Sequence, residues 1–155
     1  MNTAVIGAGY AGLVTGGCLA LLGMNVICMD IDEDKINKLR NGVVPIYEPG
    51  LESIIKENYN LGRLNFTTSI KNAVENAEVI FIAVDTPPLE DGSADMKNVH
   101  QAVRDIANHI DGYKVIVCKS TVPVGTGQWI KSEVKAVLQQ KGKLYDFDVV
   151  SNPEF

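Results

Sequence analysis

The feature that most constrains the fold of this chain is a glycine-rich turn close to its N-terminus. A short apolar run at residues 3–6 leads into the sequence GAGYAG at residues 7–12. A second apolar run, residues 26–29, ends on Asp30. The order of strand, glycine turn, helix, strand and acidic residue is typical of a site that binds a dinucleotide.

Each part of this pattern has a mechanical reason. Gly7 permits the tight turn, Gly9 lets a pyrophosphate approach the backbone, and Gly12 lets the following helix pack close to the strand. The phosphates would face the helix N-terminus, where unpaired N–H groups and the helix dipole favour negative charge. Asp30 would accept a hydrogen bond from a ribose hydroxyl.

The acidic residue also predicts which dinucleotide binds. A carboxylate at Asp30 would repel a 2′-phosphate, so the sequence favours NAD over NADP. Lys35 lies close enough in sequence to weaken this preference. The alternative is a glycine turn that joins a strand to a helix for structural reasons only.

Composition narrows the class of protein. The 155 residues suffice for one ordinary domain, and 46% hydrophobic residues fit a globular chain. A net charge of −5 without a basic block argues against a nucleic-acid partner, and the apolar runs are too short to span a membrane. Cys18, Cys28 and Cys118 form no C-x-x-C motif, which predicts buried, reduced cysteines in a cytoplasmic protein.

Apolar runs rich in Val and Ile alternate with helical patterns along the chain. Nearly continuous hydrophobicity at residues 79–84 and 115–119 predicts strands that are buried on both faces. The predicted fold class is α/β, a doubly wound, mostly parallel, Rossmann-like sheet with helices on both faces. The expected strands are 3–7, 26–30, 65–67, 79–84, 115–119 and 148–151; the expected helices are 11–22, 51–59, 70–76, 96–110, one from Asp32 to Arg40 and one from Gly125 to about Gln140.

Polar residues follow several of the expected strands. In an open parallel sheet, ligands bind beyond the carboxyl ends of the strands, so residues 84–88, 120–123 and 152–154 should gather at one edge. The loops at residues 41–50 and 85–95 are longer than a minimal α/β connection. Such loops are often functional, although they could also be simple crossovers.

Two other groups of residues are not expected to form a site. The acidic residues of the loop at 85–95 lack a recognised calcium-loop spacing, so we predict no metal site. His100 and His109 fall on different faces of one expected helix and cannot pair there.

Seven strings of sequence in one order carry a resemblance to a known family. They are AVIGAGYAGLVTG, VICMDIDEDKI, PIYEPGL, GRLNFTT, DTPPLEDGSADM, KSTVPVGT and SNPEF, and together they span the whole chain. In these strings the chain resembles the N-terminal, NAD-binding domain of the UDP-glucose/GDP-mannose dehydrogenase family.

The resemblance implies an oxidoreductase. Members of the family oxidise the C6 alcohol of a nucleotide sugar to a carboxylate and reduce two NAD per turnover; for UDP-glucose the product is UDP-glucuronate. A cysteine captures the aldehyde as a thiohemiacetal, the second oxidation gives a thioester, and water hydrolyses it. The products usually serve as polysaccharide precursors, and the whole enzyme would be a homodimer or larger.

The resemblance also implies roles for residues of this chain. Thr121 resembles the threonine that helps to hold the catalytic water, and Glu154 resembles the glutamate at the active site. The implied NAD contacts are Gly7, Ala8, Gly9, Tyr10, Ala11, Gly12, Asp30, Lys35, Val84, Asp85, Thr86, Pro87, Pro88, Ser120 and Thr121.

The sequence departs from the family pattern in two ways. Asp85 stands where the family often has Gly or Asn before Thr-Pro, which adds negative charge near the NAD site. The chain also stops at Phe155, within the NPEF string. We therefore expect the catalytic cysteine, lysine, asparagine and aspartate, the central dimer helix and the second, sugar-nucleotide domain to be absent, and residues 1–155 to be inactive alone.

Two alternatives remain open at this point. The first is a related dehydrogenase that acts on GDP-mannose or UDP-N-acetylmannosamine, although PIYEPGL together with STVPVGT favours UDP-glucose. The second is a stand-alone NAD-sensing module that regulates a partner, in which STVPVGT and NPEF would have no role.

Overall fold

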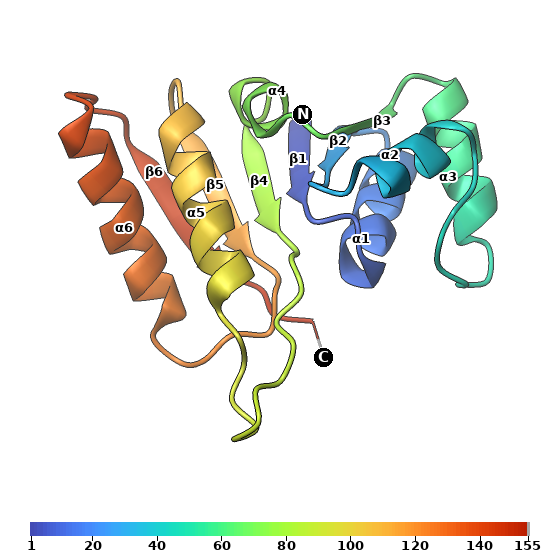
Figure 1. Cartoon of the computed structure of the whole chain (residues 1–155). Helices are drawn as coiled ribbons and strands as arrows, with labels where there is room; N and C mark the ends of the chain where they lie inside the picture. Colours follow the sequence, from blue (N-terminus) through green and yellow to red (C-terminus); the bar gives the residue numbers. More distant parts are fainter. Residues whose placement is uncertain (155) are drawn as a thin grey trace.

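The computed structural model describes residues 1–154, and its centre is one parallel β-sheet (Figure 1). The strands lie in the order β3-β2-β1-β4-β5-β6, and each neighbouring pair is parallel. This confirms the predicted Rossmann-like class, because the order reverses between β1 and β4. The strands are β1 Asn2–Ile6, β2 Asn25–Met29, β3 Leu64–Thr67, β4 Val79–Ile82, β5 Lys114–Cys118 and β6 Phe147–Ser151.

The helices begin close to the predicted positions. Asp32 and Ser69 cap their helices by accepting hydrogen bonds from the main-chain N–H groups of Lys35 and Asn72. Gly50 and Gly125 instead start helices in the left-handed conformation. The helices are α1 Tyr10–Leu21, α2 Glu33–Arg40, α3 Leu51–Asn60, α4 Ile70–Glu75, α5 Lys97–His109 and α6 Thr126–Gln140. In the described residues, no helix has the length and apolar character needed to cross a membrane.

The sheet separates two apolar cores. Along β1, Ala4 and Ile6 face the core formed with α4, α5 and α6, whereas Val5 faces the core formed with α1, α2 and α3. This alternation explains why the central strands are apolar at every position. Because all neighbouring strands are parallel, their carboxyl ends lie at one edge of the sheet, the lower edge in Figure 1.

Three expectations need correction or completion. Cys18 is exposed rather than buried, because α1 turns its glycines toward the sheet and α3 and leaves Cys18 on the outer side. Strand β4 ends at Ile82 rather than Val84. The Ile82 carbonyl accepts hydrogen bonds from the N–H groups of both Lys119 and Ser120, because the chain that follows β5 turns out of the sheet at this point. The histidines do lie apart: His100 packs against Trp129 of α6, with ring centroids 4.3 Å apart.

Candidate cofactor-binding site

The glycine turn between β1 and α1 is held by close backbone contacts. Gly7 has a φ of +104°. A Cβ at Gly7 would lie 2.5 Å from the carbonyl oxygen of Ala83, the residue that follows β4. A Cβ at Gly12 would lie 1.8 Å from the carbonyl oxygen of Gly7. Neither position can therefore hold a side chain unless the turn moves.

The N-terminus of α1 is open to an anion. Gly9 is the N-cap, it supplies no side-chain cap, and the first turn contains no acidic residue. The helix therefore presents main-chain N–H groups and the positive end of its dipole toward the sheet edge. A Cβ on Gly9 would lie 3.3 Å from Oδ1 of Asp85, so any side chain at Gly9 would enter the space in front of the turn.

Asp30 links the end of β2 to the same turn. Its Oδ2 accepts hydrogen bonds from the N–H of Ala8 at 2.8 Å and from Nζ of Lys35 at 2.9 Å, and its Oδ1 accepts from the N–H of Asp32 at 3.0 Å. A carboxylate has about four acceptor sites. With three of them used, one acceptor site on Oδ1 is left for a ribose hydroxyl.

Hydrogen bonding keeps Asp30 ionised although the site is partly desolvated. Burial acts to raise the pKa of this carboxyl, but hydrogen bonds from Asp32, Lys35 and Ala8, with the charge of Lys35, outweigh it and leave the pKa lowered. The side chain of Asp30 is 11% exposed and that of Lys35 is 27% exposed. An ionised, anchored acceptor therefore faces the cleft at neutral pH.

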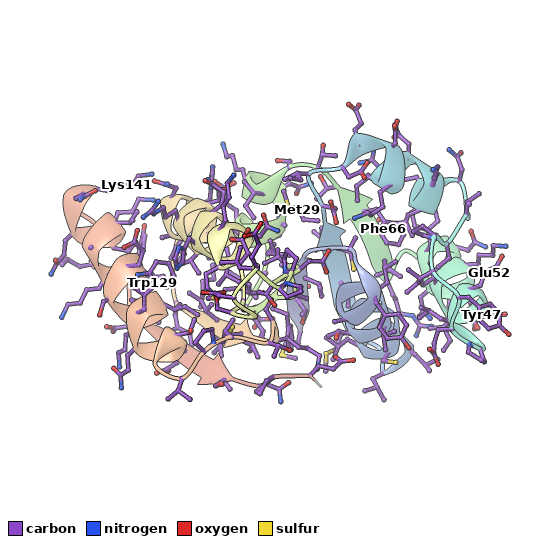
Figure 2. The ribbon with its side chains drawn as sticks, turned by 60° about the horizontal axis from the view of Figure 1, so that its bottom comes forward. Met29, Tyr47, Glu52, Phe66, Trp129 and Lys141 are labelled. Atoms are coloured by element: carbon purple, nitrogen blue, oxygen red, sulfur yellow. The ribbon has the colours of Figure 1, made fainter. Side chains whose placement is uncertain are left out.

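A cleft opens beside this carboxylate where the strand order reverses. It has a volume of about 230 Å³, and its walls come from the ends of β1, β2 and β4 and from α5. Met29 at the end of β2 lies near the middle of the molecule in Figure 2, which brings this edge forward. Because ligand pockets typically have volumes of about 300–1,000 Å³, this cleft suits one half of a dinucleotide. The polar or charged residues in its walls are Asp30, Lys35, Asp85, Asn98, Gln101 and Asp105.

A second polar group lies beyond β5 and β6. The hydroxyl of Thr121 donates to the main-chain oxygen of Glu154 at 2.9 Å, and Nζ of Lys119 pairs with Oε2 of Glu154 at 2.9 Å. Thr86 joins this group to the exit of β4, since its hydroxyl donates to the carbonyl of Thr121 at 3.0 Å. The two residues expected at the catalytic edge therefore lie together.

Other predicted site residues are either buried between the loops, as Ser120 is, or exposed in the loop after β4, as Pro87 and Pro88 are. Ser120 is buried, and its hydroxyl donates to the carbonyl of Val84 at 2.7 Å, so it fixes the two loops relative to each other. Pro87 and Pro88 are exposed in the loop after β4, where Pro88 bridges Ala94 and the loop extends beyond the sheet (Figure 1). Phe155 lies outside the described residues.

Sequence reasoning missed several residues of this edge. Lys119 has no role in the sequence prediction, yet it forms the ion pair with Glu154. Asn98 and Gln101 reach the cleft because α5 packs over the exit of β4, which no local pattern indicates. Within residues 1–154 there is no cluster of three or more His, Cys, Asp or Glu side chains that could hold a metal ion.

These residues fit a dinucleotide. The uncapped helix and the bare Gly9 suit a diphosphate, and the anchored Asp30 suits a ribose. The whole chain, residues 1–155, matches the model of the UDP-glucose/GDP-mannose dehydrogenase family, NAD binding domain. The chain belongs to the UDP-glucose/GDP-mannose dehydrogenase family. NAD, the predicted cofactor, is thereby confirmed.

Relatives of known name support this assignment. The chain is 53% identical over 98% of its length to UDP-glucose 6-dehydrogenase TuaD of Bacillus subtilis, and 49% identical over its whole length to UDP-glucose 6-dehydrogenase of Rhizobium meliloti. It covers 32% and 35% of those proteins, about a third of their length.

Solved structures show the same fold. A UDP-glucose dehydrogenase from Pyrobaculum islandicum has a TM-score of 0.89 and 38% identity over 99% of this chain and 36% of that one. A GDP-mannose dehydrogenase from Pseudomonas aeruginosa has a TM-score of 0.91 and 36% identity over 100% of this chain and 36% of that one.

Replacing Asp85 by asparagine should raise NAD affinity about two- to fivefold at low salt, since it removes an exposed negative charge beside the turn that receives the diphosphate. Titration calorimetry at low salt and at about 0.5 M salt checks this, because screening should shrink the difference. Glu90→Gln, a change further along the same exposed loop, is the control and should leave affinity unaltered. A weaker Asp85→Asn complex would mean that Asp85 contributes a needed contact.

Proposed function

We propose that this chain is the NAD-binding domain of a UDP-glucose 6-dehydrogenase, which oxidises UDP-glucose to UDP-glucuronate with two NAD. The observation that carries the proposal is the hydrogen bond from Thr121 to the main chain of Glu154, in a group that Thr86 links to the exit of β4. A domain that only bound NAD would have no use for this pair. The identity of 53% and 49% to two UDP-glucose 6-dehydrogenases supports the choice of reaction.

The residues of this chain would divide the work between two ends of the cofactor. Bound NAD supplies the hydride acceptor. The N–H groups at the start of α1 hold the diphosphate, and Asp30, oriented by Ala8 and Lys35, binds the adenosine ribose. Val84, Thr86 and Ser120 shape the wall at the exits of β4 and β5.

Glu154 would move protons, and Thr121 would orient the water. A carboxylate beside the reacting carbon can accept a proton from the substrate alcohol or from the attacking water. Lys119 holds that carboxylate by an ion pair, and Thr121 anchors the main chain of Glu154. The Thr121 hydroxyl keeps its lone pairs as acceptors for a water molecule.

The covalent nucleophile would come from outside this domain. Burial raises the pKa of the Cys28 thiol to about 12, and burial also raises the pKa of the Cys118 thiol. Neither is a thiolate at neutral pH, as nucleophilic catalysis requires. Cys18 is exposed on α1 but lies past the middle of the helix, away from the carboxyl edge. Residues 1–155 are therefore proposed to bind NAD without completing the oxidation.

Related substrates are the main alternative. The GDP-mannose dehydrogenase of Pseudomonas aeruginosa and a UDP-D-ManNAc dehydrogenase of Pyrococcus horikoshii share the fold at 36% and 30% identity. The higher identities to UDP-glucose enzymes favour UDP-glucose. We further propose a cytoplasmic enzyme that forms a homodimer or larger assembly and takes most of its sugar-nucleotide contacts from other parts of the protein.

A domain exchange tests the proposal. Placed in TuaD instead of the matching region, this chain should support NADH formation with UDP-glucose in preference to GDP-mannose and UDP-N-acetylmannosamine. Glu154→Gln in the exchanged protein should lower the rate about 100-fold or more without altering NAD affinity. Residues 1–155 alone should bind NAD and form no NADH. An exchanged protein that folds and binds NAD but oxidises no sugar nucleotide would contradict the proposal.

A further inference from the structure

The segment between α2 and α3, residues 41–50, covers the side of the sheet that carries α1, and its side chains alternate between exposed and partly buried. Val44 and Ile46 are partly buried and pack against the core that contains α1. Val43, Pro45 and Tyr47 are exposed. The segment thus has the period of a strand, although none of its residues belongs to the sheet.

Glu48 continues the inward-facing series with a charged group. It is the next partly buried position after Ile46, and its Oε2 accepts a hydrogen bond from the hydroxyl of Tyr10. The main-chain oxygen of Glu48 also accepts from the N–H of Leu51 at 3.0 Å, so the turn into α3 fixes its backbone. A partly buried position of this series thus holds a carboxylate that has a specific partner, in a hydrogen bond that is itself exposed.

That partner is the first residue of α1. Tyr10 follows the N-cap Gly9, and its main-chain N–H belongs to the helix end that faces the diphosphate. The hydrogen bond to Glu48, with slight burial and the negative charges of Glu48 and Glu154, raises the pKa of the Tyr10 phenol. Tyr10 therefore remains a neutral hydroxyl donor throughout the neutral pH range.

We propose that residues 41–50 form a strap that positions the glycine turn for the cofactor diphosphate through the hydrogen bond from Tyr10 to Glu48. The turn contains three glycines, and the first turn of a helix frays readily, so its N–H groups gain from an external tie. Fixing them before binding reduces the entropy lost when the cofactor binds. The proposal rests only on NAD binding and is independent of which sugar nucleotide is oxidised.

Titration calorimetry with NAD on the 155-residue chain tests the strap. Tyr10→Phe and Glu48→Ala should each weaken NAD binding about threefold to tenfold, and the double variant should be no weaker than either single variant. Glu48→Gln keeps a carbonyl acceptor for Tyr10 and should recover most of the affinity. Tyr47→Phe is the matched control, because Tyr47 is 89% exposed and projects outward beside α3 in Figure 2.

Hydrogen exchange gives a second readout that a purely structural role would leave unaffected. If the strap and the cofactor are coupled, NAD should slow exchange at residues 43–48 in the wild-type chain and should no longer do so in Tyr10→Phe. A Glu48→Ala variant with wild-type affinity, or a double variant whose loss is the product of the single losses, would overturn the proposal. Failure of the wild-type chain to bind NAD would instead contradict the cofactor assignment.

Discussion

Replacing Gly12 by alanine is expected to lower the free energy of unfolding by about 3 kcal/mol or more and to abolish NAD binding. The added Cβ would lie 1.8 Å from the carbonyl oxygen of Gly7, which is a rigid backbone atom in the turn that receives the diphosphate. To remove this overlap, α1 must move away from β1, and the Val5 and Leu13 packing beneath it opens. Chemical denaturation and titration calorimetry measure the two effects.

Two further glycine variants separate folding from binding. In Gly9→Ala the Cβ would meet only the flexible side chain of Asp85, at 3.3 Å, so stability should change by less than about 1 kcal/mol. NAD affinity should still fall about tenfold or more, because the methyl group stands where the diphosphate must approach. Gly127→Ala in α6 meets nothing within 4 Å and should be neutral or stabilise the fold by up to about 1 kcal/mol. Full NAD affinity in a folded Gly9→Ala chain would contradict the placement of the diphosphate.

Replacing Asp30 by alanine is expected to weaken NAD binding about 10- to 100-fold, which corresponds to the loss of charged hydrogen bonds. The carboxylate both accepts from the N–H of Ala8 in the turn and offers its remaining acceptor site to the ribose. Asp30→Ala should also narrow the preference for NAD over NADP, because the charge that repels a 2′-phosphate is gone. Titration with both cofactors measures this, and Asp34→Asn, an exposed change on α2, is the control.

The lowered pKa of Asp30 fixes the pH range of these effects. Its folded-state pKa lies below the ordinary value of about 3.9, so its stabilising contribution is complete above that value and is lost as the pH falls through the lowered pKa. Asp30 therefore stays ionised from about pH 5 to pH 8, and NAD affinity should be nearly constant there. A marked change of affinity within that range that disappears in Asp30→Ala would contradict the assigned ionisation.

The sequence could predict features that depend on local chemistry. Gly7 and Gly12 are identified by their spacing because only a residue without a side chain fits a tight strand-to-helix turn. Asp32 and Ser69 are readable as caps because their side chains bond main-chain groups three residues away. The central strands β4 and β5 follow from nearly continuous apolar runs that must be buried on both faces.

The features that escaped prediction depend on where the fold brings distant segments together. The ion pair of Lys119 with Glu154 joins residues 35 positions apart along neighbouring strand exits, so neither residue has a local signal for it. The bond from Tyr10 to Glu48 requires the 41–50 segment to cross beside α1, which depends on the packing of α3 against α1. The exposure of Cys18 depends on which face of α1 meets the sheet, because the helix is apolar nearly all round.

A crystal structure of the 155-residue chain with NAD tests the central claim most directly. The diphosphate should lie on the main-chain N–H groups at the start of α1, with an adenosine ribose hydroxyl donating to Oδ1 of Asp30 and the adenine in the cleft beside α5. A complex in which the diphosphate lies elsewhere and Asp30 contacts no part of the nucleotide would contradict the account.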